Sequence, residues 1–120
     1  MYTARFHHDH QLLDIAWHRL FTPAEVAAYT HDITARFLAE KFRPGYRLLI
    51  DMAGCGGPQP QETLAAFRDN MRLFPKASRI AIVATGAVQR RQVTRVMTQP
   101  YLRLFDHAAA ARAWLTGAAD

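Results

Sequence analysis

The single cysteine, Cys55, is the side chain best suited to nucleophilic chemistry, because a thiolate is a strong nucleophile. It lies in a glycine-rich loop between the apolar run at residues 48–53 and a predicted helix. Backbone amides and the positive end of a helix dipole would stabilise the thiolate there and lower the pKa of Cys55. We favour the interpretation as an unreactive thiol, since several residues separate Cys55 from the start of the helix and a single unpaired cysteine is common in intracellular proteins.

Asp106 and His107 are the residues that would complete a catalytic group with this thiol. They follow the last predicted strand, and the ends of parallel strands share one edge of a sheet, so a Cys-His-Asp arrangement would fit there. Asp106 also has a simpler interpretation as the N-terminal cap of the final helix. We therefore predict a protein without enzymatic activity and keep a cysteine-dependent enzyme as the weaker alternative.

The glycines Gly54, Gly56 and Gly57 offer backbone amides to a phosphate group. Their segment matches neither the phosphate-binding GxxxxGK[ST] pattern nor the dinucleotide-binding GxGxxG pattern. Glycine also permits the positive φ angles that sharp turns require. We interpret the segment as far as Gln61 as a recognition loop for a partner or ligand, and we predict no cofactor.

The histidines His7, His8 and His10 raise the question of a metal site. His8 and His10 would project from the same side if the first strand continued through them. No second cluster of ligands and no CxxC pair accompanies them. The sequence therefore favours a solvent-exposed hairpin turn and predicts no metal.

Positive charge is concentrated in the second half of the chain. The net charge is +5, and residues 71–104 contain no acidic residue. Arg91 and Arg95 are four residues apart and share one face of a helix, whereas Arg90 points about 100° away. These arginines suit a phosphate, a lipid headgroup or an acidic protein surface, or they simply face water. Nucleic acid is disfavoured, because no recognised reading motif is present.

The apolar pattern places these residues on alternating strands and helices. Thr22, Pro23 and Glu25 predict a capped helix start, and Asp106 is expected to cap the last helix. Strands are expected at residues 2–6, 12–17, 46–52, 79–84 and 101–105, with helices after residue 22, from residue 59 or 60, through residues 88–97 and over residues 108–115. The order β-β-α-β-α-β-α-β-α predicts an α/β fold with a single mixed sheet packed with helices.

Length and hydropathy limit the protein's organisation and location. A chain of 120 residues suits one domain over residues 1–120. No apolar run approaches the roughly 18 residues of a membrane helix, and the N-terminus lacks the apolar core of a signal peptide. We therefore expect a cytoplasmic protein.

Several segments, spread over most of the chain, have an order and spacing that can be compared with those of known families. They are Phe21-Thr22-Pro23-Ala24-Glu25, Tyr46-Arg47-Leu48-Leu49-Ile50-Asp51, Arg79-Ile80-Ala81-Ile82-Val83, Arg90-Arg91-Gln92, and Leu104-Phe105-Asp106 with Ala111, Trp114 and Leu115. Their order and spacing resemble the STAS family, whose founding members are bacterial anti-sigma-factor antagonists, and its SpoIIAA-like branch. No segment is a signature motif by itself.

The resemblance implies a non-catalytic regulatory or protein-interaction module whose partner is a regulator or a kinase. Regulatory STAS domains carry a phosphorylatable serine or threonine at the start of the helix after the central strand. Here residues 56–61 contain no hydroxyl, and Thr63 is the nearest one. The resemblance also implies an alternative, a carrier or sensor for a small apolar or anionic ligand in a pocket between helices and sheet. It leaves open whether the protein forms a homodimer.

Overall fold

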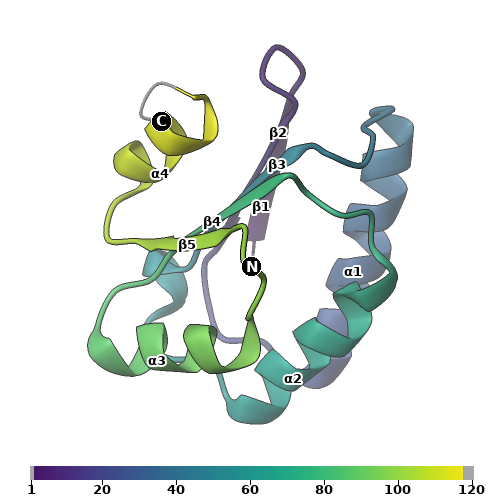
Figure 1. Ribbon diagram of the computed structural model, residues 1–120. Coiled ribbons are helices and arrows are strands. Elements are labelled where there is room, and N and C mark those ends of the chain that lie inside the picture. Colours follow the sequence, from purple (N-terminus) through teal and green to yellow (C-terminus); the bar gives the residue numbers. More distant parts are fainter. Residues whose placement is uncertain (1, 118–120) are drawn as a thin grey trace.

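The computed structural model describes residues 2–117 and contains one five-stranded mixed sheet (Figure 1). The strands lie side by side in chain order. The first two pair antiparallel, and every later neighbour pairs parallel. The strands are β1 (Tyr2–His7), β2 (Leu12–Trp17), β3 (Arg47–Asp51), β4 (Arg79–Val83) and β5 (Leu102–Phe105). The predicted α/β fold with a single mixed sheet is confirmed.

Four α-helices cover the two faces of the sheet unequally (Figure 1). The helices are α1 (Pro23–Ala39), α2 (Gln61–Asn70), α3 (Ala87–Val96) and α4 (Ala108–Leu115). The first three pack on one face, and α4 packs alone on the other. Two short 3-10 helices, η1 (Ala53–Cys55) and η2 (Met71–Leu73), follow β3 and α2. Among the described residues, no helix is long and apolar enough to cross a membrane.

The helix α1 begins as its sequence predicts, but α4 does not. The Thr22 hydroxyl accepts a hydrogen bond from the Glu25 amide at 3.2 Å, and the Glu25 carboxylate accepts one from the Thr22 amide at 2.9 Å. In α4 the N-cap is His107, without a side-chain cap. The prediction that Asp106 caps this helix is wrong, because its carboxylate instead pairs with Arg90 of the neighbouring basic helix at 2.7 Å.

The alternation of side chains along the buried strands divides the core into two clusters. In β3, Leu48 and Ile50 belong to the cluster beneath α1, α2 and α3, whereas Leu49 belongs to the cluster beneath α4. The larger cluster is rich in aromatic rings, and its Trp17 stacks on Phe67 with ring centroids 4.2 Å apart. The face covered by three helices therefore carries the larger cluster of the core, which is the one rich in aromatic side chains.

The carboxyl ends of β3, β4 and β5 share one edge of the sheet, as expected from parallel pairing. The register places Asp51 beside Val83, and Val83 beside Phe105. The glycine loop leaves this edge after β3, and the loop after β4 leads directly into α3. In open α/β sheets, ligands commonly bind at such an edge.

Candidate functional site

The glycine loop adopts a backbone that only glycine accommodates easily. Gly56 and Gly57 have φ angles of 82° and 153°, and each has open space where a side chain would begin. The loop faces the turn at Gly86 across a hollow of about 360 Å³. We call this hollow the glycine groove; it is lined by residues 53, 56–58 and 85–89. The first residues of α3 form one of its walls.

A buried glutamine joins the two sides of the glycine groove. Gln89 is 4% exposed. Its side-chain oxygen accepts a hydrogen bond from the Thr85 amide at 2.8 Å, and its Nε2 donates to the carbonyl oxygens of Met52 and Gly57 at 3.4 and 3.3 Å. Because a buried amide requires such partners, Gln89 fixes both loops at a defined separation.

Two further buried polar side chains connect the glycine loop and α2 to the start of α1. The Gln59 amide accepts from the Phe21 amide at 2.9 Å and donates to the Arg19 carbonyl at 3.1 Å. The Thr63 hydroxyl is fully buried and donates to the Phe21 carbonyl at 2.6 Å. The sequence singled out Thr63 but missed Gln59 and Gln89, whose roles depend on partners far away along the chain.

The cysteine environment contradicts the idea of an activated thiol. Cys55 is 4% exposed, and burial raises the pKa of its thiol despite a hydrogen bond from Gln59. Its sulfur lies 3.7 Å from the Trp17 carbonyl and 3.5 Å from the Gln59 Nε2. Asp106 is engaged with Arg90. The structure therefore favours the unreactive thiol over the activated one, because burial raises the pKa of Cys55 by more than the hydrogen bond from Gln59 lowers it.

The remaining predicted site residues lie around the glycine groove rather than in it. Gln61 is exposed at the first position of α2, and Gly54 is exposed beside His18. Arg90 is half-buried and donates to the Ala84 carbonyl as well as to Asp106. Arg91 and Arg95 are exposed on α3. Of these three arginines, Arg91 and Arg95 are the two presented to solvent.

A second hollow, which we call the apolar cavity, lies between the sheet, α2 and the end of α3. Its volume is about 360 Å³, within the range of small-molecule sites. Aromatic and aliphatic side chains make up most of its lining, including Trp17, Tyr29, Phe67 and Met97. A pocket between helices and sheet was an alternative from the sequence, but its lining could not be assigned, because apolar periodicity marks Tyr29, Phe67 and Met97 as inward-facing without showing a gap between them.

The apolar cavity contains few polar groups. Trp17 is 1% exposed, and its indole Nε1 has no partner within hydrogen-bond geometry among the described residues. The Tyr29 hydroxyl lies near this indole, and their interaction partly offsets the rise in the Tyr29 pKa that burial causes. The Tyr46 hydroxyl is already bound to the Pro75 carbonyl at 3.0 Å. The lining of the apolar cavity is therefore suited to an apolar group more than to a polar one.

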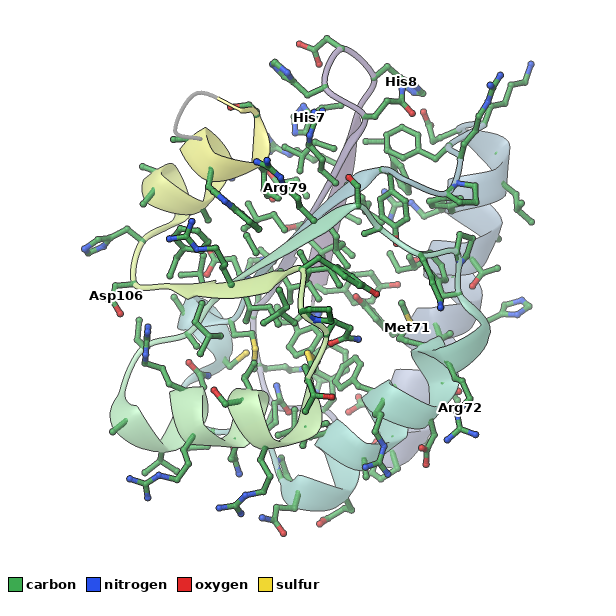
Figure 2. All side chains as sticks on the ribbon, in the orientation of Figure 1. His7, His8, Met71, Arg72, Arg79 and Asp106 are labelled. Carbon is green, nitrogen blue, oxygen red and sulfur yellow. The ribbon has the colours of Figure 1, made fainter. Side chains whose placement is uncertain are left out.

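The histidines of the β1–β2 hairpin do not converge on one point. His7 faces Asp14 at 3.6 Å, His8 contacts Glu40 at 2.7 Å, and His10 lies 3.6 Å from Asp9. Figure 2 shows His7 and His8 near the tip of the hairpin. Within residues 2–117 no group of three or more metal-ligating side chains is assembled.

The single mixed sheet with helices on both faces is an α/β fold consistent with a STAS-related domain. A family model described as SpoIIAA-like matches residues 12–116, and the chain belongs to the SpoIIAA-like family. Domains of this family are generally non-enzymatic regulatory modules. The comparison with curated proteins gave no match.

Proposed function

We propose that this chain is a non-enzymatic regulatory module, a single domain over residues 1–120, that binds a small, largely apolar ligand. The observation that carries the proposal is the apolar cavity. It measures about 360 Å³, and most of its lining is aromatic or aliphatic. Small-molecule sites are typically concave and mostly apolar, so a hollow with this lining favours a binding site.

A neutral fluorescent probe tests this function directly. N-phenyl-1-naphthylamine brightens when it enters an apolar site, and we expect the wild-type protein to bind it stoichiometrically. Met97→Trp adds bulk at the cavity wall and should abolish binding, whereas Leu38→Trp should not, since Leu38 is 67% exposed on α1. Circular dichroism establishes that both variants are folded. A wild-type protein that leaves the probe dim would refute the proposal.

A second candidate function is docking of an acidic protein partner, such as a regulator, on the exposed face of α3 beside the glycine groove. Arg91 and Arg95 favour it, because both are exposed within a stretch, residues 71–104, that lacks any acidic residue. Such a patch attracts an acidic surface over distances of about 10 Å at ordinary salt. The glycine loop, which the hydrogen bonds of Gln89 hold in place, would then determine the shape of the contact surface.

Charge reversal tests this second function. A partner crosslinked in the protein's own cells should be lost with Arg91→Glu plus Arg95→Glu. It should be retained with Arg5→Glu plus Arg43→Glu, which changes the same charge at two other exposed positions. Equal capture by both variants would exclude α3 as the docking surface.

The module works without phosphorylation in this proposal. The hydroxyl nearest the usual position belongs to Thr63, which is fully buried and hydrogen-bonded to the Phe21 carbonyl. A kinase would need that segment to unfold, and a phosphate carrying about −1.5 to −2 charge would be buried without a counter-charge. Regulation by a ligand or by partner docking avoids this cost.

A further inference from the structure

The apolar cavity has basic residues in its lining and no acidic ones. Arg68, Arg72 and Lys76 contribute to it from α2, η2 and the segment that follows. We call these three residues the rim cations. The side chains of Arg68 and Arg72 are 56% and 73% exposed, so their charged ends reach water while the cavity wall is apolar. Figure 2 shows Met71 on the inner side of the chain here and Arg72 on the outer side.

The rim retains positive charge after its own ion pairs are counted. Among the described residues, the carboxylate paired with it is Asp69, 3.3 Å from Arg68 and 3.7 Å from Arg72. Three cations against one carboxylate leave a net positive rim. No other acidic residue follows until Asp106, because residues 71–104 contain none. An anionic group at the mouth of the cavity would therefore meet attraction rather than repulsion.

The interior of the cavity has the opposite character. Most of its side chains are aromatic or aliphatic, among them Trp17, Phe67 and Met97. A charge placed there would lose its hydration without a counter-charge, which is strongly unfavourable. The chemistry of the site thus changes from apolar to cationic between the interior and the mouth.

We propose that the ligand is a free amphipathic anion, with an alkyl or aryl body inside the apolar cavity and a carboxylate or phosphate head at the rim cations. This inference rests on the proposed ligand-binding function and specifies its ligand class. A neutral apolar ligand would make no use of Arg72 and Lys76, and a bare inorganic anion would make no use of the cavity. An amphipathic anion uses both.

Intrinsic tryptophan fluorescence can report ligand binding to the apolar cavity. Its two tryptophans are Trp17, in the cavity lining, and Trp114, which packs on Phe105 at the opposite face of the sheet. In a Trp114→Phe background, emission therefore comes from Trp17 alone. We would titrate this protein with decanoate, decyl phosphate, 1-decanol and inorganic phosphate below the micelle concentration, at low and high salt.

The expected result is that decanoate or decyl phosphate binds about five- to tenfold more tightly than 1-decanol, a difference suited to exposed ion pairs. Salt should remove much of that preference. Arg72→Gln plus Lys76→Gln should abolish the preference while leaving 1-decanol binding unchanged. The matched control, Arg5→Gln plus Arg43→Gln, removes the same charge away from the cavity and should behave as wild type.

Each other outcome contradicts a defined part of the proposal. Equal binding of decanoate and 1-decanol would overturn the role of the rim cations but leave the cavity as a ligand site. Inorganic phosphate binding as tightly as decyl phosphate would reduce the site to a surface anion site. Sedimentation with phosphatidylglycerol vesicles would make a bilayer lipid, not a free ligand, the source of the head. No response to any chain-bearing probe would refute the proposed ligand-binding function itself.

Discussion

Buried polar side chains determine the shape of the glycine loop. Gln59, Thr63 and Gln89 are each at most 4% exposed, yet every one of them has hydrogen-bond partners in a different segment of the chain. A buried amide or hydroxyl that lost its partners would be strongly unfavourable. The loop therefore has one preferred conformation, which suits a surface that a partner must recognise.

Replacing Gln89 with leucine should destabilise the fold by about 1–3 kcal/mol, because the Thr85 amide would lose its acceptor inside the protein. Urea unfolding at neutral pH measures the change. Gln61→Leu is the control, since Gln61 is exposed on the same side of the molecule and should change stability by less than about 0.5 kcal/mol. Equal effects of the two substitutions would show that the Gln89 bridge contributes nothing.

The Cys55 thiol should be less acidic in the folded protein than in the unfolded chain, because burial raises its pKa. Thiolate absorbance or iodoacetamide labelling against pH, with and without urea, compares the two states. The raised pKa contributes stability that is complete below the unfolded pKa and is lost as pH rises through the folded pKa. A folded thiol that ionises at lower pH than the unfolded one would reinstate the reactive-cysteine alternative.

At the level of elements, alanine substitutions at Thr22 and Asp106, which precede α1 and α4, should have different effects on the stability of the fold. Thr22→Ala removes a capping box and should cost about 1 kcal/mol. Asp106→Ala removes an ion pair whose carboxylate is 72% exposed, so it should cost less than about 0.5 kcal/mol. Thermal unfolding of both variants measures the difference. A larger loss for Asp106→Ala would indicate a capping role that the hydrogen bonds do not show.

Local signals account for the parts of the structure that could be predicted from sequence. Apolar periodicity located all five strands and four helices, and the Thr22 cap lies within three residues of its partner Glu25. The Gln89 bridge and the apolar cavity depend on how separate elements pack, so periodicity does not reveal them. The sequence does contain one signal for the cavity wall. Phe67 and Met71 are four residues apart, as are Arg68 and Arg72, so this segment presents an apolar stripe beside a basic stripe.

At the scale of the whole molecule, α3 borders both hollows. Its first residues, through Gln89, line the glycine groove, and Val96 and Met97 at its other end line the apolar cavity. Between them Val93 is fully buried against the core. One helix thus contributes to both the proposed ligand site and the proposed docking surface.

Alkaline pH should unfold the protein cooperatively, because its core tyrosines resist ionisation. Burial is the main cause in each case: it raises the pKa of Tyr2 to about 12, with a further contribution from Asp32, and it raises the pKa values of Tyr29 and Tyr46 as well. The unfolded chain ionises these hydroxyls near the ordinary value of 10. Their contribution to stability is therefore complete below about pH 10 and is lost as pH rises through the folded pKa values.

Tyrosinate absorbance and circular dichroism, followed together against pH, test this expectation. Most tyrosinate should appear with the loss of native circular dichroism, not before it. Tyr29→Phe removes one such ionisation and should move the alkaline midpoint upward, because Tyr29 is buried and its hydroxyl no longer favours the unfolded state at high pH. Its stability at pH 7 serves as the control and should change little. Tyrosines that all ionise near pH 10 in a protein that keeps its native spectrum would contradict the buried cluster.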